Sequence, residues 1–203
     1  MARSYDQYCP IAAALDVVGD RWTLLIMREL MAGDRRFTDL RERLAGIAPN
    51  LLSERLRELQ AEGLVEQKEL PPPAARTVYA ATKLGHELVP VLRSLARFGV
   101  SRLGPPDEQD VEPQMAVYGM IAPYHVPEPE GERFHARLEV DGNTFDVVTD
   151  GARLSLRRRP DDVPDAVLTI SARDLVAARQ GARDILADDD PGAARFGRLF
   201  QLA

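Results

Sequence analysis

Three polar side chains are spaced so that a single helix would present them together. Asn50, Ser53 and Arg57 lie three and four residues apart in NLLSERLRELQAEGL, residues 50–64, which places them on one helix face. The opposite face carries a leucine stripe, Leu52, Leu56 and Leu59. Base edges in the DNA major groove are read by hydrogen bonds, for which arginine suits guanine and asparagine suits adenine. The spacing therefore predicts a helix that reads DNA.

The residues before this helix predict a partner helix. Thr38 follows Phe37, and its hydroxyl could cap a short helix over DLRERLA, residues 39–45. The tripeptide GIA then turns the chain, and Pro49 suits the first position of the next helix. Two short helices joined by a glycine-containing turn indicate a helix-turn-helix.

Basic residues around this unit have more than one interpretation. Arg35 and Arg36 could contact phosphate, but a solvated pair explains them as well; we count Arg36 and Thr38 as candidate DNA contacts. Arg55 and Glu58, within the second helix, are expected to be solvated surface.

A hairpin is expected directly after the second helix. The segments LVEQKEL, residues 64–70, and RTVYAAT, residues 76–82, read as strands, and PPPAA forms a tip where no ladder donor is needed. A hairpin in this place is a wing, from which Lys68 and Arg76 could reach phosphate or the minor groove.

Further helices complete this half of the chain. Pro10 begins a helix that Gly19 ends, and WTLLIMRELMAG, residues 22–33, predicts a central helix. Thr82 is expected to cap one long helix over residues 83–103. Its apolar stripe is broader than a small domain needs, and comprises Leu84, Leu88, Val91, Leu92, Leu95 and Phe98.

Several of these motifs, in order, resemble the HxlR family of winged helix-turn-helix regulators. The resemblance covers residues 8 to about 100: CPIAAALDVVGDRWTLLIMREL, RRFTDLRERLAGIAPNLLSERLRELQAEGLV, and TKLGHELVPVL after the wing. It implies a homodimer built from the first and last helices, with two recognition helices set for neighbouring major grooves. One departure is Ala48, where relatives often carry a capping hydroxyl; its absence costs the helix about 1 kcal/mol.

Cys9, the single cysteine, has two interpretations. In some members of the family a cysteine near this place senses oxidants, and a helix N-terminus favours the reactive thiolate. A Cys-Pro pair also occurs in relatives that are not redox sensors. Without a second cysteine in the chain, only an intersubunit or mixed disulfide is available.

Composition limits the class of protein. The net charge of −6 divides unevenly: residues 1–100 hold 14 Lys and Arg against 13 Asp and Glu, and residues 101–203 hold 12 against 19. DNA binding then needs only a local basic face in the first half. No apolar run suggests a membrane span, and the N-terminal residues MARSYDQYCP lack the apolar core of a signal peptide, so we expect a cytoplasmic protein. His86, His125 and His135 are not spaced as metal ligands, and no phosphate loop or nucleophile motif indicates an enzyme or a cofactor.

A second domain is expected after GPPDEQDVEP, an acidic, proline-rich linker at residues 104–113. Strands at 133–140, 144–149 and 152–159 predict a meander, followed by a strand at 166–170, a helix that Ser171 caps and that ends at Gly181, and a last helix over 192–203. This order resembles a sterol-carrier-like domain, which implies an apolar ligand between sheet and helices. The candidate contacts, which are equally core residues, are Met120, Phe134, Phe196 and Phe200.

The sequence thus predicts an α+β protein with three parts. Residues 1–103 form a winged helix-turn-helix domain for DNA binding and dimerisation, residues 104–113 a linker, and residues 114–203 a small sterol-carrier-like domain with an antiparallel sheet. The predicted function is that of a homodimeric, sequence-specific regulator of transcription that binds double-stranded DNA and responds to a small apolar ligand. Two alternatives stay open: a thiol redox sensor acting through Cys9, and a second domain that serves dimerisation alone.

Overall fold

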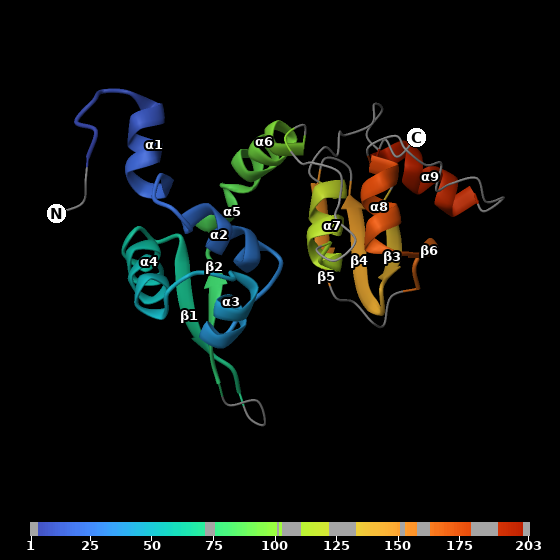
Figure 1. Ribbon diagram of the computed structural model, residues 1–203, viewed down its shortest axis with the longest axis horizontal. Coiled ribbons are helices and arrows are strands. Elements are labelled where there is room, and N and C mark those ends of the chain that lie inside the picture. The colour runs from blue at the N-terminus through green and yellow to red at the C-terminus, as the bar shows by residue number, and fades with distance from the viewer. Residues whose placement is uncertain are drawn as a thin grey trace. The chain divides into compact units, whose positions relative to one another are not determined.

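The computed structural model describes residues 4–71, 76–100, 102, 111–121, 133–150, 153–157, 163–179 and 191–200. Contacts divide the chain into two compact units, Met1–Leu92 and Arg93–Ala203, and each is described below by itself (Figure 1). Several predicted features lie outside the described residues: the wing tip at 72–75, most of the linker, His125, the end of the strand predicted over 152–159, and the helix end at Gly181.

Four helices open the first unit: α1 (Pro10–Val18), α2 (Thr23–Met31), α3 (Phe37–Arg43) and α4 (Pro49–Ala61). Proline begins α1 and α4 as predicted, because its missing N–H is not needed in the first turn. Between α1 and α2, Trp22 takes a left-handed conformation with φ 82°, which separates the two helices. Ala48 precedes α4 without a side-chain cap.

The predicted cap of α3 is wrong. The helix begins at Phe37, so Thr38 lies inside its first turn and Arg36 holds the capping position. The Asp39 carboxylate accepts a hydrogen bond of 2.9 Å from the backbone N–H of Arg36. An acid three residues into the helix thus satisfies the donor at its start, and the hydroxyl is not required.

The wing is present in the predicted place. Strands β1 (Val65–Glu69) and β2 (Thr77–Ala81) pair antiparallel, with Lys68 opposite Val78. Arg35 adds a short bridge, because its backbone exchanges two hydrogen bonds with Tyr79, at 2.9 and 2.7 Å. The segment between α2 and α3 is thereby fixed to the wing.

The single helix predicted over residues 83–103 is divided into α5 (Lys83–His86) and α6 (Val89–Val100). Thr82 caps α5 as predicted, its hydroxyl accepting from the Gly85 N–H at 3.0 Å. The break precedes Pro90, which has no N–H to continue a helix from α5. Gly85 itself is required by a close approach, because a Cβ there would lie 2.3 Å from the Leu64 carbonyl oxygen.

The core of the first unit lies where α2, α3 and α4 meet the wing. Its centre is formed by fully buried side chains of Ile26, Met27, Leu30, Leu40, Leu52, Leu56 and Leu59. The leucine stripe of α4 therefore faces inward as predicted.

The second unit is a four-stranded sheet with helices. Its strands are β3 (Phe134–Val140), β4 (Asn143–Asp150), β5 (Arg153–Arg157) and β6 (Ala166–Ile170), in the order β5-β4-β3-β6. The predicted meander β3-β4-β5 is antiparallel as expected, but β6 pairs parallel with β3. A wholly antiparallel sheet is thus wrong: the chain crosses back from β5 to the far edge instead of adding a neighbouring hairpin.

Helices α7 (Pro113–Ile121), α8 (Ala172–Arg179) and α9 (Pro191–Phe200) supply the second layer. They contribute to one apolar core with alternate residues of β3, among them Val117, Leu175, Phe196 and Leu138. Ser171 caps α8 as predicted, its hydroxyl accepting from the Asp174 N–H at 3.0 Å. Within the described ranges, no helix is long and apolar enough to cross a membrane.

Candidate nucleic-acid interface

Helix α4 has an apolar face that packs into the core and a polar face that is accessible. Leu52, Leu56 and Leu59 are at most 2% exposed, whereas Asn50 and Arg57 are exposed on the other side and Ser53 is half-buried. The packing thus brings the three predicted base-reading side chains onto one accessible face. An amide, a hydroxyl and a guanidinium on an exposed helix can donate to base edges.

Local hydrogen bonds orient two of these side chains along the helix. The Ser53 hydroxyl donates to the Pro49 carbonyl at 3.0 Å, and Arg57 Nε donates to the Ser53 carbonyl at 3.3 Å. The hydroxyl oxygen still has acceptor capacity, and the Nε bond does not involve the terminal Nη groups of Arg57. Both side chains therefore lie along α4, with the Ser53 hydroxyl and the Arg57 Nη groups on its accessible face.

Arg55 differs from the predicted solvated residue. Its side chain is 14% exposed, and Nη1 donates to the carboxylates of both Asp20 and Glu58. Asp20 belongs to the junction between α1 and α2, 35 residues away in the chain. Helix periodicity shows that Arg55 flanks the leucine stripe, but only the fold brings Asp20 to it. Glu58 is exposed as predicted.

Arg36 is engaged at the start of α3. Its Nε donates to Asp39 at 2.9 Å, and its backbone N–H donates to the same carboxylate. The side-chain hydrogen bond from Arg36 lowers the pKa of Asp39 below its ordinary value, and the same pair raises the pKa of Arg36. Arg36 would have to share or leave Asp39 to contact a phosphate. Thr38 is exposed in the same first turn.

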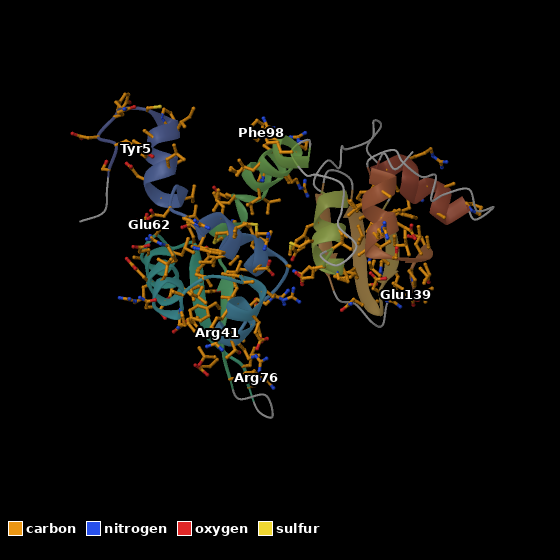
Figure 2. The ribbon with its side chains drawn as sticks, viewed as in Figure 1. Tyr5, Arg41, Glu62, Arg76, Phe98 and Glu139 are labelled. Carbon is orange, nitrogen blue, oxygen red and sulfur yellow. The ribbon has the colours of Figure 1, made fainter. Side chains whose placement is uncertain are left out.

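The wing carries the other two predicted contacts. Lys68 is exposed on β1, and its Nζ lies 3.2 Å from Glu66 Oε1. Arg76 is exposed at the start of the return strand, and its carbonyl accepts from the Leu70 N–H at 2.9 Å. Figure 2 labels Arg76 beside the end of the drawn wing and Arg41 on α3. Arg41 is exposed and was not among the sequence candidates, although its place in the predicted first helix could have identified it.

A buried carboxylate supports the first helix of the motif. Glu29 on α2 is fully buried, and Arg28 Nη2 lies 2.8 Å from it. Arg43, at the end of α3, lies 3.9 Å from the other carboxylate oxygen. Since a buried carboxylate is tolerated only when paired, this cluster links α2 to α3.

Cys9 occupies the capping position of α1, as predicted for a thiol at a helix N-terminus. Its side chain is partly buried, and its carbonyl accepts from the Ala13 N–H at 2.9 Å. The predicted location is therefore present, while its redox chemistry stays a prediction.

The candidate ligand contacts of the second unit lie in its closed core. Each of the four side chains, Met120, Phe134, Phe196 and Phe200, is 1% exposed. The ring centres of Phe196 and Phe200 lie 4.6 Å apart. The Arg195 guanidinium sits 4.8 Å from the Phe134 ring centre. The fold brings these residues together in one core cluster, while their role as ligand contacts stays a prediction.

The other face of this sheet carries a buried polar cluster that the sequence analysis missed. His135 Nε2 and Arg137 Nε each lie 2.9 Å from Asp146 Oδ1. Alternation along β3 could have placed His135 opposite the apolar face, but not beside Asp146. Among the described residues, no group of His, Cys, Asp and Glu could hold a metal ion.

Comparisons with known proteins agree with the geometry of the first unit. A sequence model of the HxlR-like helix-turn-helix family matches residues 17–106. YvaP of Bacillus subtilis strain 168, an uncharacterized HTH-type transcriptional regulator, is 32% identical over 100 residues, which cover 49% of this chain and 93% of YvaP. The HTH-type transcriptional regulator YodB of the same organism is 34% identical over 88 residues, 43% of this chain and 79% of YodB.

Among solved structures, the reduced form of the redox regulator HypR is 28% identical and covers 46% of this chain and 92% of its own, with a TM-score of 0.43. The matches to YvaP, YodB and HypR each span about half of this chain.

The Asp39–Arg36 pair generates a prediction about stability and pH. Asp39→Asn removes a carboxylate whose folded-state pKa is lowered, so the native protein loses stability that is present above the unfolded-state pKa of about 3.9. We expect a lower Tm than wild type at pH 7. The difference should shrink as pH falls below about 4 and through the lowered folded-state pKa, where the wild-type carboxylate also becomes protonated. Thermal melts by circular dichroism between pH 7 and pH 2.5 would measure this; a constant difference contradicts it.

Proposed function

This chain belongs to the HxlR-like helix-turn-helix family of transcriptional regulators, and on that premise we propose that it binds double-stranded operator DNA as a sequence-specific homodimer. The observation that carries the proposal is the orientation of α4. Its leucine face is locked into the core, and Asn50 and Arg57 project from the opposite face.

Each candidate contact has a role that follows from its chemistry. On α4, Asn50, Ser53 and Arg57 would read base edges in the major groove. From the wing, Lys68 and Arg76 would contact phosphate or the minor groove, which sets affinity more than sequence preference. In α3, the helix that crosses the DNA backbone in this motif, phosphate contacts would come from Arg36, Thr38 and Arg41.

Exposed apolar side chains support the homodimer. Large hydrophobic residues stand exposed on α1, α5 and α6: Ile11, Leu15, Leu84, Val91, Leu95 and Phe98. Ile11 is 72% and Phe98 62% exposed. Exposed large apolar side chains on these helices favour association with a partner. A two-fold dimer through these helices would set two copies of α4 at half-sites about 34 Å apart, one helical turn of DNA.

A small apolar ligand is the signal that the second unit supports. Its sheet and helices share an apolar core that includes Phe134, Phe196 and Phe200, and a sterol-carrier-like domain would hold its ligand between these layers. Met120 borders the same core and could adapt to a ligand. A bound molecule would regulate DNA binding only by favouring one arrangement of the dimer over another.

A thiol signal through Cys9 is the alternative. Cys9 precedes the first helical residue of α1, next to a surface that the proposed dimer would bury. Oxidation would join Cys9 to the partner's thiol or to a small thiol, releasing two electrons to an oxidant such as diamide. Either product would change the surroundings of α1.

Base reading by α4 predicts the effect of Arg57→Ala. Loss of a bidentate contact should weaken binding to a selected operator by about 10- to 100-fold, corresponding to about 1–3 kcal/mol. Binding to random DNA should weaken much less. Lys68→Ala should weaken both similarly and reduce the salt slope by about 1. Titrations at several salt concentrations measure this, with Arg198→Ala, an exposed arginine on α9, as the control. Equal losses on operator and random DNA for Arg57→Ala would refute base reading.

The apolar surface predicts the oligomeric state. Leu95→Asp places a charge in the proposed dimer contact, so we expect a shift from dimer to monomer in sedimentation equilibrium and weaker operator binding. Val167→Asp, on an exposed apolar residue of β6, should leave the dimer intact. A monomeric wild type, or a Leu95→Asp protein that is as dimeric as wild type, contradicts the assignment.

One binding experiment separates the two signals. If the apolar ligand is the signal, a fatty acid should change operator affinity equally in wild type and Cys9→Ser, and diamide should change neither. If the thiol is the signal, diamide should weaken operator binding by wild type alone. No response to either treatment favours a second unit that serves assembly only, and fluorescence titration with a fluorescent fatty acid tests whether the ligand binds at all.

A further inference from the structure

We propose that Arg55 is a positioning residue for α4, which fixes the recognition helix to the α1–α2 junction through Asp20 and thereby sets operator affinity without touching DNA. The inference rests on the proposed function of α4. It assigns a role in recognition to two residues that lie outside the base-reading face.

The geometry of Arg55 carries the proposal. One terminal nitrogen, Nη1, donates to Asp20 outside the helix and to Glu58 one turn further along it. The guanidinium is largely buried although both acids are exposed, and its Nε is buried without a hydrogen-bond partner. A guanidinium carries five N–H donors. In Arg55, Nη1 contacts Asp20 while the buried Nε is left without a hydrogen-bond partner.

The leucine stripe alone does not fix α4 to the accuracy that base reading needs. Apolar burial is non-directional, so it defines the rotation of α4 about its axis less sharply than a hydrogen bond to a fixed partner does. Hydrogen bonds to base edges require atoms within a few tenths of an ångström. Arg55 lies beside the stripe and away from Arg57, where a directional contact restrains rotation without occupying the DNA face.

Asp20 also connects α4 to the N-terminal segment. It directly follows Gly19, the C-terminal cap of α1. At the other end of the contact path, Asp16 of α1 accepts hydrogen bonds of 2.9 Å from the Ser4 hydroxyl and the Tyr5 N–H. Asp20 and Arg55 thus form a direct contact between the end of α1 and the recognition helix.

Asp20→Asn tests the proposal because loss of its charge and loss of its contact with Arg55 would change operator affinity in opposite directions. Removing a negative charge from a DNA-binding protein should by itself strengthen binding to the polyanionic DNA. If Asp20 positions α4 through Arg55, Asp20→Asn should instead weaken binding to the selected operator by about tenfold, within the range measured for coupled residues. Binding to random DNA should stay the same or tighten slightly. Because the substitution lies outside α4, it leaves the helix sequence unchanged.

Glu62→Gln is the matched control. Glu62 is an exposed acid at the C-terminal end of α4, labelled in Figure 2, so the substitution removes the same charge without affecting Arg55. We expect no loss of operator affinity for this protein. If Asp20→Asn and Glu62→Gln behave alike, the positioning role is wrong.

A double-mutant cycle identifies the partner. Asp20→Asn should cost operator affinity in the wild-type background and nothing further in an Arg55→Gln background. Additive losses would mean that Asp20 does not act through Arg55. Arg55→Lys, which keeps the charge but not the geometry of a guanidinium, should recover only part of the loss seen with Arg55→Gln. Equal Tm values for wild type and Asp20→Asn would show that the loss of affinity does not come from general destabilisation. A Tm drop large enough to account for the lost affinity would overturn the positioning role.

Failure of this inference is distinguishable from failure of the proposed function. If wild type selects no operator and binds all DNA equally, sequence-specific binding itself is wrong. If wild type selects an operator and Asp20→Asn binds it as tightly, the function stands and the positioning role falls.

Discussion

Burial of the α4 leucine stripe is the constraint on which the candidate interface depends. Fully burying one leucine contributes about 1.5–3 kcal/mol, and Leu52, Leu56 and Leu59 are all buried. A turn of the helix large enough to expose them would therefore cost several kcal/mol. The outward direction of Asn50 and Arg57 follows from this burial, because helix geometry fixes the angle between the two faces. The core thus determines which side chains can meet DNA.

Charged contacts add direction to this apolar framework. Glu29 joins α2 to the end of α3 through Arg28 and Arg43, and Asp39 fixes the start of α3. Buried ion pairs contribute little net stability compared with apolar residues, but losing one partner is costly. Glu29 is fully buried, so loss of Arg28 or Arg43 would leave its carboxylate less well paired in the core. Directional contacts also fix the wing, because backbone hydrogen bonds between Arg35 and Tyr79 join the α2–α3 segment to β2.

Features governed by neighbours in the chain were predictable, and those governed by distant contacts were not. Proline at the start of α4, the cap at Thr82, the leucine periodicity and the wing all depend on a few adjacent residues. The apolar period across residues 83–103 predicts one helix, but Pro90 has no N–H with which to continue the ladder from α5, and the helix breaks before it. Arg55 appeared solvated because nothing local indicates Asp20. Likewise, the strand pattern of residues 166–170 did not reveal that they pair with β3 in parallel.

The packing of the second unit limits how a ligand could act. Protein interiors are close-packed, and Phe134, Phe196 and Phe200 are buried in the core that the sheet and helices share. An apolar ligand in that core would have to displace at least one of these rings, and α9 carries two of them. Occupancy would therefore be coupled to movement of α9, and the differential affinity that regulation requires would arise from that movement. By contrast, the His135–Asp146–Arg137 cluster on the other face holds β3 and β4 in register. The two faces of the sheet thus differ in chemistry: one packs into the apolar core that α9 shares, and the other carries hydrogen-bonded polar groups.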